Sequence, residues 1–277
     1  MGRGGAIGIA AVAAWACALV LGAGGAFGAG EAGARARWSP PAHLTWYWQL
    51  QGRVRVENVA ASDIDGFDNG GAEVARLHRL GQHVVCYVDV GSWERWRPDA
   101  GRFPASVMGR SNGWPGEKWL DIRQLGVLEP IMRARFAMCA RKGFDAVEPD
   151  NMDGFENPTG FHISAAQQLT YDRWVARTVH RLGMSVFEKN DPEQAAQLEP
   201  SFDGVLDEQC NQYHECGSFR SYLLAGKPVL NAEYKRSLYP GFCSGDERLG
   251  ISGALYAVEL NGTLFDPCTV NPDSLQL

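Results

Sequence analysis

The sequence predicts an α/β protein of the (β/α)8-barrel class, also called a TIM barrel, formed by a single domain after an N-terminal leader. Eight short apolar segments recur along the chain, and most of them end in a polar or acidic cluster. Stretches of helical character separate several of these segments, and glycines close them. About 240 residues remain after the leader, which is close to the usual size of such a barrel.

Residues 1–34 have the layout of a secretory signal peptide with a short tail. An arginine near the start precedes an apolar run from about Ala6 to Phe27, and small residues follow. The run is nearly long enough to span a bilayer, so a retained membrane anchor is the alternative. Its glycine content and its small-residue end favour cleavage. We therefore expect a secreted protein without stable membrane association, in which residues 35–277 form the catalytic barrel domain.

The candidate strands are apolar segments of seven or eight residues. Continuous apolar strands are typical of a parallel sheet that is covered on both faces. In chain order the candidates are residues 44–50, 61–68, 83–90, 144–151, 184–190, 202–209, 227–234 and 254–260. Eight such units close a barrel more naturally than they extend an open sheet. No GxGxxG motif follows an early strand, which makes a dinucleotide-binding sheet the poorer choice.

Helix-like stretches lie between several of the strands, at residues 71–80, 128–142, 165–182 and 219–225. Each is followed by a glycine that can adopt the left-handed conformation at a helix C-terminus. These glycines are Gly81, Gly143, Gly183 and Gly226. The order of strand, helix and glycine is typical of a parallel α/β fold.

The overall charge argues against a nucleic-acid partner. The formal net charge is −6, whereas nucleic-acid-binding proteins normally present a basic face. An acidic balance fits a cationic or neutral ligand better.

Six of the seven cysteines lie after the leader, an even set in a chain that we expect to be exported. A zinc site is disfavoured because the chain has no CxxC, HxH or HExxH spacing, and we expect no metal. Cys86 and Cys139 lie in apolar segments, where they could be either a disulfide or a buried free pair. The expected disulfides are Cys210–Cys216 and Cys243–Cys268.

Carboxylates are concentrated after the predicted strands, at the face where barrel enzymes place their active sites. Acids crowded in one mouth repel each other, so one titrates high while a partner stays ionised, as glycoside cleavage requires. Asp150 follows the fourth strand and Glu208 the sixth, and we expect them to face each other across the mouth as the catalytic pair. A helix cap or a loop ion pair is the structural alternative for each.

Further polar residues at the strand ends are candidates for substrate contacts. Alternation along the strand puts Glu148 on the same face as Asp150, and Lys189 can pair with one of the acids. For both residues, a purely structural ion pair is the alternative. Asp65 lies in a turn-rich segment, where an Asx turn would also explain it. The complete predicted set is Asp65, Tyr87, Glu148, Asn151, Lys189, Glu233 and Tyr234.

A long loop follows the third predicted strand, from Trp93 to Trp119, and it holds four tryptophans. Loops of this length in compact domains are usually functional. The indoles therefore predict either one wall of a substrate groove or a loop that packs on the top of the barrel.

Several long motifs resemble the endo-α-1,4-polygalactosaminidase family, glycoside hydrolase family 114. The resemblance runs from about Leu44 to Cys268. The motifs that carry it are WYWQLQG, DIDGFD, VVCYVDVGSWERWRPD, WPGEKWLDIR, GFDAVEPDNMDGFENPTGF, the KN at 189–190, DEQCNQYHEC and the AEY that contains Glu233.

The resemblance implies a barrel hydrolase that cleaves inside α-1,4-linked galactosamine polymers and needs no cofactor. The family's acids after the fourth and sixth strands correspond to Asp150 and Glu208 in this sequence. The expected partner is therefore a galactosamine-rich, cationic polysaccharide. Two other functions stay open: a barrel glycosidase that acts on another α-galactose or N-acetylgalactosamine glycan, and a catalytically silent carbohydrate-binding barrel.

Overall fold

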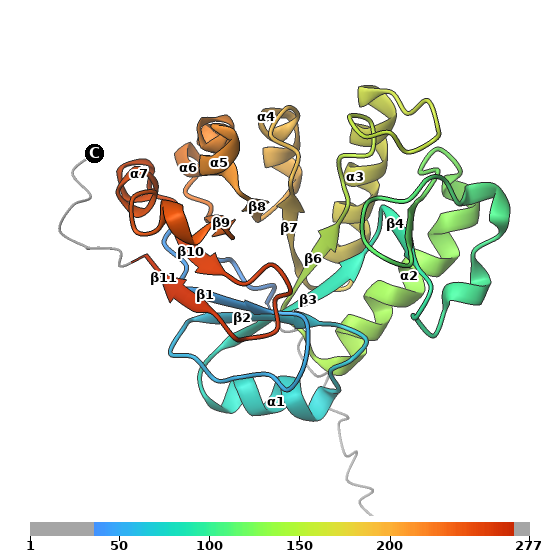
Figure 1. The fold of residues 1–277 in the computed structure, drawn as a ribbon. Helices are drawn as coiled ribbons and strands as arrows, with labels where there is room; N and C mark the ends of the chain where they lie inside the picture. Colours follow the sequence, from blue (N-terminus) through green and yellow to red (C-terminus); the bar gives the residue numbers. More distant parts are fainter. Residues whose placement is uncertain (1–35, 269–277) are drawn as a thin grey trace, which may run out of the picture. The chain divides into compact units, whose positions relative to one another are not determined.

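The computed structural model describes residues 36–268, and the predicted signal peptide lies outside them. The described residues form a (β/α)8 barrel, as the sequence predicts, with the strands at the centre and helices around them (Figure 1). Among these residues, no helix is both long enough and apolar enough to cross a membrane.

Eight parallel strands follow one another around the barrel in chain order, and each overlaps its predicted segment. Their bounds are β1 (Trp46–Gln49), β2 (Ala61–Asp65), β3 (His83–Asp89), β6 (Ala146–Asp150), β7 (Ser185–Lys189), β8 (Gly204–Glu208), β9 (Val229–Glu233) and β10 (Ser252–Tyr256). A short ninth strand, β11 (Phe265–Pro267), pairs antiparallel with β10.

The first and last parallel strands, β1 and β10, are not paired in the sheet, and other contacts join them to nearly close the barrel. The Trp46 indole N–H of β1 donates to the backbone carbonyl of Ser252 in β10 at 2.9 Å. Beyond the strand ends, the backbone N–H of Leu50 donates to the carbonyl of Leu260, also at 2.9 Å. Strand β1 is thereby fixed to the segment around β10.

The helices are long in the first half of the barrel and short in the second. The predicted helices are present as α1 (Gly71–Arg79), α2 (Leu125–Lys142), α3 (Ala165–His180) and α6 (Arg220–Leu224). The four predicted glycines all have positive φ, between 70° and 90°. Three further short helices were not predicted: α4 (Ala195–Leu198), α5 (Cys210–Tyr213) and α7 (Cys243–Leu249). Within the described chain, no helix joins β1 to β2.

Side chains alternate along each strand between two apolar layers, as the period of two requires. In β3, Val85 belongs to the cluster inside the barrel, whereas Val84 and Cys86 belong to the cluster under the helices. In β9, Leu230 and Ala232 face inward in the same way. This register decides which polar residue at the end of a strand can reach the barrel mouth.

The long tryptophan loop contains a small hairpin. Strands β4 (Ser92–Glu94) and β5 (Glu117–Trp119) pair antiparallel and separate from the barrel sheet. Two 3-10 turns, η1 (Ala100–Arg102) and η2 (Ala105–Val107), lie between them in the chain. The hairpin stands beside the C-terminal ends of β3 and β6 (Figure 1).

All six cysteines after the leader are paired in the structure. The two predicted disulfides, Cys210–Cys216 and Cys243–Cys268, are present. Cys86 of β3 and Cys139 of α2 form the third, which ties a barrel strand to its covering helix across a sequence separation of 53 residues. The pairing that the sequence left open is therefore a disulfide.

Candidate active site

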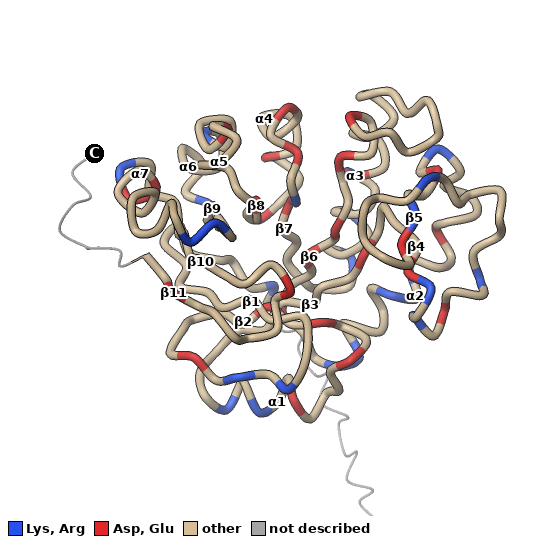
Figure 2. The backbone as a smooth tube through the Cα atoms, viewed as in Figure 1, with Lys and Arg blue, Asp and Glu red and all other residues tan. Residues whose placement is uncertain are grey.

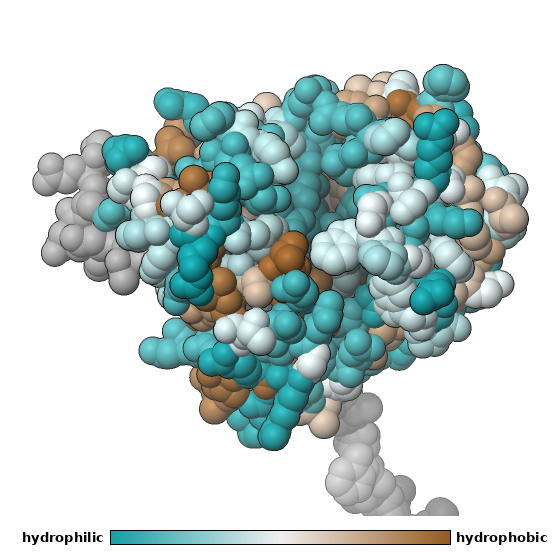
Figure 3. All heavy atoms as spheres, in the orientation of Figure 1, coloured by the Kyte–Doolittle hydropathy of each residue, from teal (hydrophilic) through white to brown (hydrophobic). Residues whose placement is uncertain are grey.

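A cavity of about 390 Å³ opens at the C-terminal ends of the barrel strands. The space-filling view shows this hollow with a largely hydrophilic lining (Figure 3). Acidic residues recur at the ends of β6, β7 and β8 (Figure 2). Of the described residues, only two basic ones, Arg97 and Lys189, line the cavity. Its eight acidic residues are Asp65, Asp68, Glu94, Glu117, Asp150, Asp153, Glu208 and Glu259.

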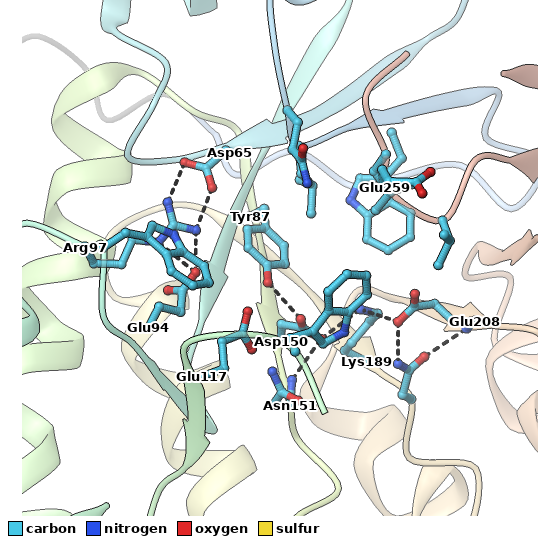
Figure 4. A pocket seen from close by; sticks show the side chains of 18 of the residues that line it. Asp65, Tyr87, Glu94, Arg97, Glu117, Asp150, Asn151, Lys189, Glu208 and Glu259 are labelled. Atoms are coloured by element: carbon cyan, nitrogen blue, oxygen red, sulfur yellow. Dashed lines mark hydrogen bonds and ion pairs between the residues drawn. The ribbon is translucent and has the colours of Figure 1, made fainter. Parts of the chain in front are cut away.

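Asp150 and Glu208 lie next to the same ammonium group, that of Lys189. Lys189 Nζ is 2.8 Å from Asp150 Oδ1 and 3.0 Å from Glu208 Oε2 (Figure 4). The three residues end the adjacent strands β6, β7 and β8. The two acids therefore lie side by side around Lys189 rather than opposite each other across the mouth, because only one strand separates theirs.

The residue that follows each of these three side chains has an unusual backbone conformation. Asn151, Asn190 and Gln209 have φ values of 60°, 51° and 69°. Non-glycine residues rarely adopt this left-handed conformation, which costs free energy and is concentrated at functional sites. Directly after β6, it lets the Asn151 N–H turn back and donate to Asp150 Oδ1 at 2.9 Å.

Asp150 is surrounded by donors that favour its ionised form. The Tyr87 hydroxyl donates to Asp150 Oδ2 at 2.8 Å, while Lys189 and the Asn151 N–H contact Oδ1. Burial alone would raise the pKa of Asp150, but Lys189 and these hydrogen bonds outweigh burial and lower it below its usual value. Asp150 is therefore a carboxylate over the ordinary range of pH.

Glu208 is held by a second set of donors. Asn190 Nδ2 donates to Glu208 Oε2 at 2.8 Å, and the Glu208 backbone N–H donates to Asn190 Oδ1 at 2.9 Å. The Tyr234 hydroxyl contacts the other oxygen, Oε1. These contacts fix the carboxyl group in one orientation toward the cavity.

A second pair of acids lies beneath the first and is closed off from the cavity. Glu148 is fully buried, and its Oε1 is 3.2 Å from Lys189 Nζ. Burial raises the pKa of Glu148 to about 7, although Lys189 opposes the rise. Burial, together with the neighbouring Glu148, also raises the pKa of Asp63 well above its usual value. Glu148 therefore supports Lys189 from below and does not line the cavity.

The other predicted contact residues differ in how far they reach the cavity. Tyr87 and Asn151 line it, and Asn151 Nδ2 also donates to the buried Asp89 at 2.8 Å. Asp65 lines it as well, but Arg97 holds both of its oxygens at 3.0 and 2.6 Å. Asp65 also accepts hydrogen bonds from the backbone of its own turn, the Asx-turn role that the sequence left open.

Neighbouring residues Glu233 and Tyr234 lie on opposite sides of the sheet. Glu233 is fully buried and accepts a hydrogen bond from the Asn211 N–H at 2.9 Å. It follows the outward register of β9, so it lies outside the barrel and away from the cavity. Tyr234 follows the inward register and reaches Glu208.

Comparison with known proteins agrees with this geometry. The model of glycoside-hydrolase family GH114 matches residues 29–270. The chain belongs to glycoside-hydrolase family GH114. A solved structure of Ega3 from Aspergillus fumigatus, in complex with galactosamine, is 31% identical to this GH114 hydrolase. The match covers 84% of this chain and 98% of that chain, with a TM-score of 0.79.

A more distant likeness supports the fold alone. The glycoside hydrolase domain of PelA from Pseudomonas aeruginosa is 14% identical to the GH114 hydrolase, with a TM-score of 0.63. The match covers 79% of this chain and 96% of that chain. No curated protein sequence matches the chain.

The tryptophan loop, for which the sequence left two roles open, contributes to the lining of the GH114 cavity. Trp96, Trp114 and Trp119 of the long loop line it, so this part of the loop is a wall of the cavity. Trp93 instead packs against the core, and its indole N–H donates to the Ala100 carbonyl at 3.1 Å. The lining residues that were not predicted include Glu94, Arg97, Glu117, Asp153, Asn157 and Asn190.

Proposed function

We propose that this GH114 hydrolase is exported and cleaves polysaccharide that contains α-1,4-linked galactosamine at internal positions. The proposal rests on one observation, the placement of the Asp150 and Glu208 carboxyl groups around buried Lys189 in an acidic cavity. The galactosamine bound by the relative Ega3 supports the class of sugar.

The charge of the cavity favours a cationic substrate. Eight acidic residues line it against two basic ones, and both basic residues are already occupied by acids. Arg97 forms ion pairs with Asp65 and Glu94, and Lys189 forms ion pairs with acids from β6 and β8. The remaining negative field attracts galactosamine, whose free amine carries a positive charge at neutral pH, more strongly than a neutral acetylated sugar.

The spacing of the two carboxyl groups favours a retaining mechanism. Asp150 Oδ1 and Glu208 Oε2 lie 2.8 and 3.0 Å from the same nitrogen, so they are no more than about 6 Å apart. Retaining glycosidases hold their two carboxyl groups roughly 5 to 5.5 Å apart, whereas inverting enzymes need roughly 6.5 to 9.5 Å to admit a water molecule.

In the proposed first step, an Asp150 oxygen forms a bond with the anomeric carbon while the bond from that carbon to the glycosidic oxygen breaks. Glu208 gives its proton to the leaving oxygen. In the second step, Glu208 takes a proton from water, the water oxygen bonds to the anomeric carbon, and Asp150 is released. The lowered pKa of Asp150, which Lys189 causes against the effect of burial, suits it to be the nucleophile.

Export is supported by the cysteines as well as by the leader. Six cysteines form three disulfides, and such bonds persist in oxidising compartments and are rare in the cytosol. Secretion by the native host, followed by sequencing of the mature N-terminus, tests this part of the proposal.

Conservative substitution of the two acids tests the chemistry. We expect Asp150→Asn and Glu208→Gln to lower the release of reducing ends from deacetylated α-1,4-galactosamine polymer by on the order of 10³-fold or more. Glu129→Gln is the matched control, because Glu129 is an acid on the outside of α2 that forms an ion pair with Arg133, outside the cavity lining. Thermal unfolding of each variant shows whether the fold is intact.

Two outcomes would overturn the proposal. Full activity in both folded variants would refute the catalytic pair. If wild-type protein cleaves only the N-acetylated polymer, the proposed mechanism stands but the proposed substrate is wrong.

A further inference from the structure

We propose that Glu117 and the neighbouring Trp96 form an ammonium-binding subsite, which recognises the 2-amino group of the sugar whose anomeric carbon faces Asp150. The inference rests on the proposed function. It identifies the residue that would determine the specificity of the enzyme for galactosamine over N-acetylgalactosamine.

Glu117 is held in place by one of its oxygens and leaves the other available. Asn112 Nδ2 donates to Glu117 Oε2 at 2.5 Å, and Ser92 Oγ lies 3.2 Å from the same oxygen. Oε1 has no hydrogen-bond partner among residues 36–268. The side chain comes from β5 of the hairpin and lies beside Asp150 in the cavity (Figure 4).

Among residues 36–268, Glu117 forms no ion pair with the cations near it, although Arg95 Nε would lie only 2.9 Å from a Cβ atom added to the adjacent Gly116. Within the described chain, no basic side chain forms an ion pair with it, since Arg97 and Lys189 are bound to other acids. Burial, and then repulsion by Asp150 and Glu94, raises the pKa of Glu117 against the hydrogen bond from Asn112. A positively charged group of the substrate would stabilise the ionised form of Glu117 against burial and against the repulsion by these acids.

The chemistry of the substrate places its ammonium near this carboxylate. In galactosamine, the amino group is on C2, one bond away from the anomeric carbon that Asp150 would attack. The acceptor for this ammonium must therefore lie next to Asp150, as Glu117 does. An acetamido group has no positive charge and is larger, so it would leave Glu117 without a counter-ion.

Two tryptophans near Glu117 in the chain, Trp96 and Trp114, line the same cavity. A Cβ atom on Gly116 would lie 3.1 Å from the Trp96 ring, so this ring packs on the backbone just before Glu117. The Glu117 N–H donates to the Trp114 carbonyl at 3.2 Å, which closes the turn. Both indoles line the cavity and are about half exposed, at 51% for Trp96 and 50% for Trp114. In the proposed subsite, an indole that lines this cavity would add a cation–π contact to the ammonium bound by Glu117.

The test compares Glu117→Gln with Glu259→Gln on two substrates. Glu259→Gln removes the same charge from the same cavity, but Glu259 lies on the loop after β10 and on the other side of the site (Figure 4). We expect Glu117→Gln to lower kcat/KM on deacetylated oligomers by about tenfold or more and to change kcat/KM on N-acetylated oligomers by less than about twofold. Glu259→Gln weakens the general negative field of the cavity by the same charge, so we expect it to lower the ratio between the two substrates by no more than about threefold, well short of the effect of Glu117→Gln. A Glu117→Gln variant with the wild-type ratio would overturn the inference while leaving the proposed function intact.

Binding of monosaccharides tests the subsite without hydrolysis. Calorimetric titration with galactosamine and with galactose compares a charged ligand with a neutral one of similar shape. We expect wild-type protein to bind galactosamine at least about tenfold more tightly than galactose, and Glu117→Gln to bind both alike. Equal binding of the two sugars by wild-type protein would overturn the inference, whatever the protein does to the polymer.

Discussion

Lys189 is a buried cation whose ionic partners are all carboxyl groups. Burial alone would lower the pKa of its ammonium, but Asp150, Glu208 and Glu148 outweigh burial and raise it well above the usual value. The Trp48 ring lies 4.9 Å from Nζ and adds a cation–π contact. Lys189 thus stays charged and holds the two proposed catalytic acids in one place.

Replacing Lys189 with Met tests this role through the pH dependence of the reaction. Without the ammonium, burial raises the pKa of Asp150, and a nucleophile must be ionised to react. We therefore expect the acidic limb of the kcat/KM profile to move to higher pH by roughly one to three units. Loss of a buried ion-pair partner should also lower the free energy of unfolding by about 3 to 5 kcal/mol.

Glu148→Gln is the control for Lys189→Met, because it removes a buried partner of Lys189 but keeps the ammonium next to Asp150. Its acidic limb should remain close to that of the wild type. An unshifted acidic limb in a folded Lys189→Met variant would contradict the role of Lys189.

At the residue scale, the alternation of side chains along a strand predicted which face some site residues occupy, which short motifs alone do not show. Alternation along β6 correctly placed Glu148 and Asp150 on one face. By the same rule, the neighbours Glu233 and Tyr234 cannot both face the cavity. Which of the two faces it depends on the register of β9 against its neighbouring strands. The depth of Glu148 also could not be predicted, because burial depends on the layers above and below it.

At the scale of elements, glycine allows β3 and β6 to approach closely beneath the site. The Gly91 N–H donates to the Asp150 carbonyl at 3.1 Å, just after β3 ends. A Cβ atom at Gly91 would lie 1.7 Å from the Asn151 carbonyl oxygen, which leaves no room for a side chain. The loop between β3 and the hairpin therefore sets the position of the Asp150 backbone.

Gly91→Ala should push the Asp150–Asn151 backbone away from β3. We expect this to lower the free energy of unfolding by about 1 to 3 kcal/mol and kcat/KM by on the order of 100-fold. Chemical denaturation and steady-state kinetics measure the two effects. Gly217→Ala is the control, since nothing lies within 4 Å of its added methyl group. A Gly91→Ala variant as stable and active as this control would contradict the packing argument.

The regular elements were predictable because apolar strands of seven or eight residues and glycine-terminated helices carry strong local signals. The hairpin that bears Glu117 was not, because β4 and β5 have three residues each and are separated by 22 residues. Their pairing depends on contacts between distant segments. The short helices α4, α5 and α7 were also missed, since one or two turns show little periodicity.

At the scale of the whole molecule, the barrel brings together acids that the chain keeps 58 positions apart, at Asp150 and Glu208. Three disulfides and two apolar layers hold the strands, and the strand ends converge on one acidic cavity. The fold thereby supplies what the proposed chemistry needs: a fixed pair of carboxyl groups, a cation between them, and a negative field for a cationic polymer.

The anomeric configuration of the first product tests this account most directly. Proton NMR spectra recorded during the first minutes of hydrolysis of deacetylated galactosamine oligomers distinguish the α from the β reducing end before they interconvert. Asp150 Oδ1 and Glu208 Oε2 contact the same nitrogen of Lys189 and therefore lie within about 6 Å of each other, which predicts that the α-linked substrate first releases the α-anomer. Initial release of the β-anomer would mean inversion and would contradict the role of Asp150 as a nucleophile.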